Sequence, residues 1–176
     1  MKTLLHALLT FATLTLITGV GYPLLVTGIA RVAFAHQANG SLITGADGKL
    51  FGSELLAQEF KSPRYFWPRP SAAAFATVPS GASNLGSTSA ALKLVISDRA
   101  AALRKAHNLP DNALVPAELV QASGSGLDPH ISADAARFQL KRVCTARGLD
   151  EALVSALIGD GQVNVLKLNQ TLDTLH

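Results

Sequence analysis

A glycine- and serine-rich stretch holds the residues best suited to chemistry, Ser123-Gly124-Ser125-Gly126-Leu127-Asp128-Pro129-His130. Successive backbone N–H groups in such a loop, beside a helix that begins near Ser132, can form an anion-binding nest. The candidate nucleotide or anion loop therefore comprises Ser123, Gly124, Ser125, Gly126, Asp128 and His130. The alternative is a structural turn in which Asp128 and Ser132 cap local backbone, and spacing alone favours this turn because short glycine motifs are unspecific.

The loop lacks the further residues that known catalytic motifs require. No Gly-Lys-Ser/Thr follows it, as a P-loop would need, and Gly124-Ser125-Gly126 is tighter than a nucleophile elbow. A hydrolase acting through Ser123 or Ser125 would need a base, and none is evident. Asp128 and His130 supply two metal ligands where zinc needs three or four. The residues therefore predict neither a catalytic centre nor a metal site.

A second candidate is the aromatic run Arg64-Tyr65-Phe66-Trp67-Pro68-Arg69-Pro70. Aromatic residues interleaved with arginine can anchor a protein interface, but they also bury large areas in a core. We expect one or two of the aromatic residues in the core. Trp67 and Arg69, with Asn84 from the following Ser/Gly-rich run, are the candidates for a partner interface.

Charge gives little indication of a partner. The chain carries 15 basic and 12 acidic residues, a formal net charge of +3, and it has no basic stripe of the kind that binds nucleic acid. The densest cluster, Arg137, Lys141, Arg142 and Arg147, is predicted to be one solvated helix face. Cys144 is the single cysteine, which excludes an internal disulfide, and we expect a buried, inert thiol.

The N-terminus predicts a membrane helix. Residues 7–30 contain no Asp, Glu, Lys, Arg or His, and about 36 Å of helix crosses a hydrocarbon core of about 30 Å. A cleaved signal peptide is the alternative, with Ala33-Phe34-Ala35 as its cleavage site, but the apolar stretch is about twice the usual length. Lys2 and the α-amino group favour an N-terminus inside and a domain outside.

Small residues on this helix suggest that other membrane helices pack against it. Ala12, Thr15 and Gly19 recur at helical spacing, and so do Thr18, Gly21 and Gly28 with Leu25 among them. Small residues let two helices approach closely in lipid. The alternative is that Gly and Thr are simply common in membrane helices.

The remaining chain predicts a mixed α/β (α+β) domain. Residues 1–35 are expected to form the tail and transmembrane helix, and residues 36–176 the extracytoplasmic domain. Turn signals, caps and apolar spacing predict these elements: a strand over 41–44, a turn over 46–49, helices over 53–60, 89–106, 132–148 and 150–158, a strand over 163–168 and a C-terminal helix from 169.

Several segments, taken in order, resemble the C subunit of Kdp-type potassium-transporting P-type ATPases, the KdpC family. They are the aromatic run with Ser71 and Ala72, the run at residues 80–86, Ser123-Gly124-Ser125-Gly126-Leu127-Asp128-Pro129-His130-Ile131-Ser132, and Val163-Asn164-Val165-Leu166 with Leu168 and Asn169. The resemblance extends from the anchor to the last helix, and the third segment is the most specific.

The resemblance implies a non-catalytic accessory subunit of a bacterial inner-membrane complex that imports potassium at the expense of ATP. The implied partners are an ATP-hydrolysing pump subunit, a channel-like potassium-translocating subunit and membrane lipid. The C subunit is needed for assembly and is described as a catalytic chaperone that raises ATP affinity, its Ser-Gly-Ser-Gly loop being likened to a nucleotide-binding signature. No firmly bound cofactor is implied, because the complex as a whole handles ATP and potassium.

The predicted topology conflicts with direct ATP binding. A domain outside the membrane cannot reach cytoplasmic ATP, so an effect on nucleotide affinity would travel through partner subunits as a coupling free energy. A physical alternative to direct ATP contact is that the domain covers the extracellular mouth of the channel-like subunit. An alternative function of a different class is that of a stand-alone, membrane-tethered domain that binds a small anion. Residues 159–162 also form a shorter connection than the family usually has, which puts in doubt any partner contact made there.

Overall fold

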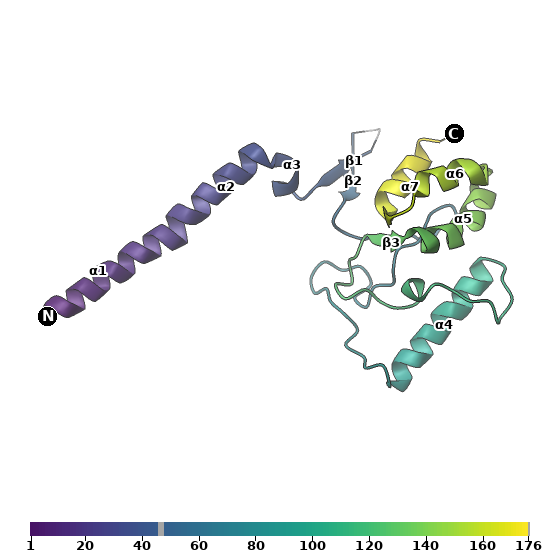
Figure 1. Cartoon of the computed structure of the whole chain (residues 1–176), viewed down its shortest axis with the longest axis horizontal. Coiled ribbons are helices and arrows are strands. Elements are labelled where there is room, and N and C mark those ends of the chain that lie inside the picture. The colour runs from purple at the N-terminus through teal and green to yellow at the C-terminus, as the bar shows by residue number, and fades with distance from the viewer. Residues whose placement is uncertain (46–47, 176) are drawn as a thin grey trace. The chain divides into compact units, whose positions relative to one another are not determined.

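The computed structural model describes residues 1–45 and 48–175, which form two compact units, Met1–Leu42 and Ile43–His176. The first unit is helical: α1 (Lys2–Leu16), a π-helical turn η1 (Ile17–Gly21), α2 (Tyr22–Ala33) and the short α3 (Ala35–Ala38) (Figure 1). The continuous stretch Lys2–Ala33 is long and apolar enough to cross a membrane. Neither α1 nor α2 has a residue that is buried in the protein. This confirms one N-terminal helix of membrane-spanning length.

The π-helical turn precedes the proline of this helix. Pro23 lies in the first turn of α2 and has no N–H to donate to the preceding turn. A π-helical turn widens the backbone at such a position. The small residues before and after η1 therefore do not follow one uninterrupted α-helical spacing.

A two-stranded sheet follows, formed by β1 (Leu42–Thr44), whose first residue is the last of the first unit, and β2 (Leu50–Ser53). The predicted turn between them is closed by hydrogen bonds between Gly45 and Lys49 and between Gly48 and Gly45, while Ala46 and Asp47 lie outside the described residues. The helix predicted over residues 53–60 is wrong. The Ser53 hydroxyl accepts from the N–H of Leu55 in a local turn, and the N–H of Ala57 donates to the Leu127 carbonyl instead of to a helical partner.

The helix predicted over residues 89–106 is confirmed as α4 (Ala90–Ala106). Ser89 caps it by accepting from the N–H of Leu92. A 3-10 turn, η2 (Ala117–Leu119), follows Pro116. Between β2 and α4 the chain runs without regular elements, apart from turns.

The C-terminal part packs three helices beside a small antiparallel sheet. Strand β3 (His130–Ser132), which was not predicted, leads into α5 (Ala133–Arg147) and α6 (Glu151–Ile158), the two helices predicted over residues 132–148 and 150–158. Strand β4 (Gln162–Asn164) then pairs with β3 and runs into α7 (Val165–Asp173). The strand predicted over residues 163–168 is wrong beyond Asn164. The Asn164 side chain caps α7 by accepting from the N–H of Lys167, so the helix begins before residue 169.

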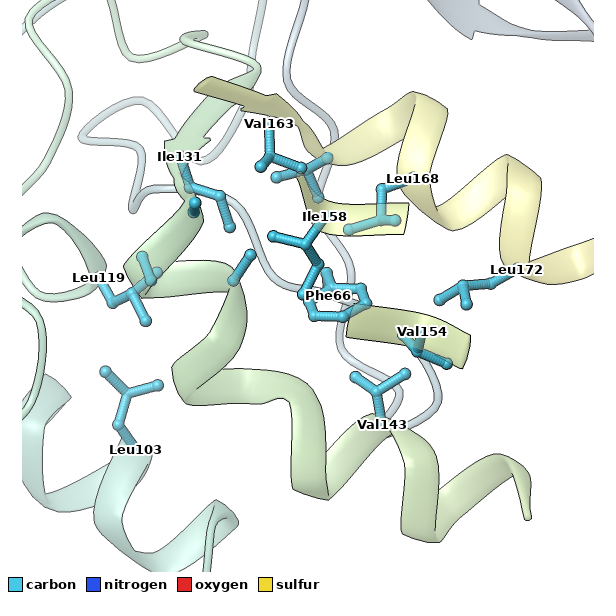
Figure 2. Packing of buried hydrophobic residues seen from close by; sticks show 14 of the residues in the cluster. Phe66, Leu103, Leu119, Ile131, Val143, Val154, Ile158, Val163, Leu168 and Leu172 are labelled. Carbon is cyan, nitrogen blue, oxygen red and sulfur yellow. The ribbon is translucent and has the colours of Figure 1, made fainter. Parts of the chain in front are cut away.

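The core of this unit gathers around Phe66, which is 0% exposed. Figure 2 shows its ring beside Val143 of α5 and Val154 and Ile158 of α6, with Leu168 and Leu172 of α7 nearby. Each buried aliphatic side chain contributes roughly 1.5–3 kcal/mol. The mixed helix and strand class predicted for the domain is confirmed.

Candidate functional site

The Gly/Ser loop is joined to two other segments that the sequence marks. The N–H of Ser123, which is 2% exposed, donates to the Pro70 carbonyl at 3.1 Å. Gly126 has a φ of +72°, and a Cβ there would lie 2.8 Å from the Gly81 carbonyl oxygen. Both the conformation and the close approach therefore require glycine at position 126. The loop, the aromatic run and the run at residues 80–86 meet here.

Most of the loop's donors are used within the protein. The N–H of Gly126 donates to the Ser123 carbonyl, that of Leu127 to the Ser125 hydroxyl, and that of His130 to Asp128 Oδ1. Among the described residues, the N–H groups of Gly124, Ser125 and Asp128 have no acceptor, and of these only Gly124 and Ser125, which are adjacent, belong to exposed residues. These two adjacent donors are what the loop can offer to an anion. A role for Ser123, Gly124, Ser125, Gly126, Asp128 and His130 in nucleotide binding stays a prediction.

Asp128 links the loop to the aromatic run. Its Oδ2 accepts from Arg69 Nη1 at 3.1 Å, and its Oδ1 lies 3.8 Å from His130 Nδ1. These three side chains, with Glu118 and Gln162, line a polar concavity of about 420 Å³. In the part of the chain that the structure describes, no three His, Cys, Asp or Glu side chains are placed to share a metal ion.

Glu118 was not singled out from the sequence. Its carboxylate accepts from the backbone N–H of Ser132 at 3.1 Å and from the Ser132 hydroxyl, which in turn accepts from the N–H of Ala135 to cap α5. A lone glutamate before a Gly/Ser loop carries no pattern that predicts this contact. It fixes the start of α5 against η2.

The aromatic run is an extended segment whose backbone is bonded by side chains and not by a neighbouring strand. The buried amide of Gln139 bonds to the N–H and C=O of Trp67 at 2.8 and 3.0 Å. The Trp67 indole N–H donates to the Ser62 carbonyl, and the Arg142 guanidinium lies 4.0 Å above its ring. Trp67 and Arg69 thus have contacts within the domain, while Asn84 is exposed with a φ of +54°. Their role at a partner interface stays a prediction.

The basic residues of α5 are not one solvated face. Arg137 and Lys141 are exposed, but Arg142 is 8% exposed and the Arg147 side chain 4%. Arg142 donates to the carbonyls of Pro63 and Tyr65. The prediction was wrong because an extended run without a strand partner leaves carbonyls that need donors. Burial lowers the pKa of Arg142 to about 10.

Comparison with known proteins places the whole chain in one family. The model of the family described as "K+-transporting ATPase, c chain" (KdpC) matches residues 4–174. The chain belongs to the KdpC family. Relatives named potassium-transporting ATPase KdpC subunit include one from Pseudomonas aeruginosa strain UCBPP-PA14, 49% identical with 99% of this chain and 98% of that protein covered. Others come from Methylibium petroleiphilum, 50% identical with 98% of each chain covered, and Geobacter sulfurreducens, 45% identical with 99% of each covered.

The predicted packing positions of this KdpC-family chain lie on the membrane-length helix and are all exposed; they are Ala12, Thr15, Thr18, Gly19, Gly21 and Gly28. The Thr18 hydroxyl donates to the Leu14 carbonyl, which satisfies it within the helix. A Cβ added at Gly28 would meet nothing within 4 Å, and one at Gly19 would meet only Thr15 Cγ2, at 4.0 Å. The helix itself therefore does not require glycine at these two positions.

Proposed function

We propose that the chain is a non-catalytic accessory subunit of an ATP-driven potassium-import complex. The observation that carries this proposal is the family match over residues 4–174, which includes the apolar helix as well as the domain. The relatives, named as potassium-transporting ATPase subunits, are covered almost end to end. The function is therefore proposed for the whole chain.

The geometry of the Gly/Ser loop supports an accessory role. Ser123 is buried, and the Ser125 hydroxyl accepts a hydrogen bond from the Leu127 N–H. Within the described part of the chain, neither serine hydroxyl is hydrogen-bonded to a His, Asp or Glu side chain. A serine nucleophile needs a base within hydrogen-bond reach. ATP hydrolysis then belongs to a partner subunit, and potassium passes through a channel-like one. The loop instead joins three segments of the domain.

The proposed topology is a single-pass protein of the bacterial inner membrane, with its N-terminus cytoplasmic and its domain extracytoplasmic. The short basic N-terminal tail with Lys2 supports this orientation. With the domain outside, its influence on ATP affinity is a coupling free energy transmitted through the partners' membrane segments. The chaperone role is then allosteric.

The anchor is also proposed to be an assembly element. Gly19 and Gly28 leave space that the chain itself does not fill. An apolar hollow around Gly28 is lined by Leu24, Leu25, Ile29, Val32 and Ala33. In lipid, close packing against such positions is a main source of helix association. The partner helices would be those of the pump and channel-like subunits.

Co-purification tests the proposal. A tagged chain, expressed with the genes beside its own and extracted in mild detergent, should bring down an ATP-hydrolysing subunit and a channel-like subunit. Potassium-stimulated ATPase activity should be recovered in the same fraction and lost when this chain is omitted. Purification of the chain alone from membranes that contain both other subunits would overturn the proposal.

A further inference from the structure

A concavity of about 460 Å³ lies between the C-terminal end of α4 and the outer face of α5. The apolar part of its lining comes from Pro63, Ala106, Leu109 and Ala146. Its polar side chains are His107 and Asn108 beyond the end of α4, and Lys141, Arg142 and Thr145 from α5. It is separate from the Gly/Ser loop, none of whose residues line it.

The charge of this concavity is positive and uncompensated. Lys141 and Arg142 contribute two cations, and no acidic residue is among the described residues that line it. Arg142 makes four hydrogen bonds, and all four acceptors are uncharged: the Pro63 and Tyr65 carbonyls, Gln139 Oε1 and His107 Nε2. A buried guanidinium without a counter-ion is costly. An anion in the concavity would lower that cost.

The neighbouring His107 ring is uncharged in this arrangement. His107 Nδ1 lies 2.8 Å from the Leu103 carbonyl, and Nε2 lies 3.2 Å from the donating Arg142 Nε. These two bonds together fit only the neutral tautomer with its proton on Nδ1. At the end of α4, the carbonyls of Leu103, Arg104 and Lys105 accept hydrogen bonds from the N–H groups that follow. They therefore present no unpaired carbonyl oxygen that would repel an anion in the concavity.

We propose that this concavity binds a small organic phosphate monoester. Its two negative charges match Lys141 and Arg142, and its three terminal oxygens can accept from Lys141, Thr145 and Asn108. A carboxylate or a phosphodiester offers one charge and matches less well. The apolar part of the lining accommodates a short alkyl or ring body beside the phosphate. The chain's one tryptophan reports on the site, because Arg142 lies 4.0 Å above the Trp67 ring.

The test is a titration of the full-length chain in detergent with butyl phosphate, followed by Trp67 emission and thermal unfolding. We expect a saturable change in emission and a rise in melting temperature, since a ligand of the folded state stabilises it. Lys141→Glu should weaken binding by about tenfold or more, as expected when one charged hydrogen-bonding partner is lost. Lys93→Glu, an identical charge change at an exposed position of α4, should leave the affinity within about twofold.

Three outcomes would overturn the proposal. They are the absence of both a saturable emission change and a melting shift, equal affinity in the Lys141→Glu and Lys93→Glu variants, or tighter binding of diethyl phosphate than of butyl phosphate. The last would assign the site to phosphodiesters, the chemistry of a phospholipid headgroup. Butanol at the same concentrations is the uncharged control and should produce no saturable change. Because Lys141 is exposed, its variant should fold, and circular dichroism checks this.

Discussion

The side-chain amide of Asn169 bonds to both backbone groups of Phe66, accepting from its N–H at 2.8 Å and donating to its C=O at 2.9 Å. Asn169 is 0% exposed and lies 103 residues from its partner. Gln139 makes the same pair of bonds to Trp67. Two side-chain amides thus make the backbone hydrogen bonds that a neighbouring β-strand would otherwise make to the aromatic run.

Replacing Asn169 by leucine should destabilise the domain by about 2–4 kcal/mol. The substitution conserves size but leaves a buried N–H and a buried C=O without partners, at about 1–3 kcal/mol each. Urea unfolding of the full-length chain, followed by Trp67 emission, measures the loss. Asn112→Leu, at an exposed position, is the control and should change stability by less than about 0.5 kcal/mol. Equal stability of the two variants would contradict the role given to Asn169.

Gly126→Ala should be far more harmful than Gly124→Ala. Position 126 combines a φ of +72° with a Cβ position 2.8 Å from the Gly81 carbonyl oxygen, whereas a Cβ at position 124 meets nothing within 4 Å. Strain and overpacking together should cost about 2–4 kcal/mol at position 126. The same urea experiment compares the pair. A Gly126→Ala protein as stable as Gly124→Ala would show that the loop is not tied to residues 80–86.

The domain should lose stability below about pH 6.5 because of His107. Burial lowers the pKa of His107 and the charge of Arg142 lowers it further, while the bond to the Leu103 carbonyl acts in the opposite direction. The unfolded chain, whose histidine titrates near pH 6.5, therefore binds a proton first as the pH falls. Stability declines from that pH down to the lower pKa of the folded state.

Unfolding free energies measured from pH 7.5 to pH 5 check this dependence. The groups facing His107 are Arg142 and the Leu103 carbonyl, with the rings of Trp67 and Phe138 beside it. His107→Gln should flatten the slope over this interval, whereas His130→Gln should retain it. An unchanged slope in His107→Gln would assign the effect elsewhere.

Gly28→Leu and Gly19→Leu should reduce recovery of the complex without unfolding the helix. The chain leaves room for a side chain at both positions, so the defect would arise from a lost close approach of a partner helix. We expect at least about a tenfold lower yield of co-purified partners, corresponding to about 1.4 kcal/mol. Full recovery with both leucine variants would remove the case for packing at these glycines.

A single engineered thiol can establish the orientation. Cys144 is 3% exposed, and burial raises its thiol pKa, with nearby Glu151 and Asp150 adding to the effect, so it should react slowly with maleimides. Asn84→Cys, at an exposed position, should be labelled in intact spheroplasts by an impermeant maleimide, and Lys2→Cys only after lysis. The reverse pattern would place the domain in the cytoplasm.

Helices with strong local signals could be predicted from the sequence. Ser89, Ser132 and Asp150 each precede an apolar pattern, and each caps the helix that follows it. The structures of residues 53–60 and 163–168 were predicted wrongly. In the first segment the deciding contact is with a distant residue, and in the second one residue belongs to two elements. Leu127 takes the N–H of Ala57 and prevents a helix there, and Asn164 is both the last residue of β4 and the cap of α7.

The loop's internal bonds could be foreseen only in part. Local capping by Asp128 and Ser132 was predicted from their side chains and positions, and both caps are present. The packing of Gly126 on Gly81 and the burial of Arg142 could not be foreseen, because each depends on segments far apart in the chain. Helical spacing alone does not distinguish an arginine facing solvent from one facing unpaired carbonyls.

Helix α7 supplies the partners of Tyr65 and Phe66 in the aromatic run. At about 5–20 residues per second of synthesis, roughly 5–20 s separate the emergence of Phe66 from that of Asn169. During this interval Tyr65 and Phe66 lack Asp173, Asn169 and Leu172, so the aromatic run needs protection from aggregation. A prematurely terminated chain would keep its apolar anchor but never finish its domain. Only chains that have been translated through α7 can therefore present a folded domain to a partner.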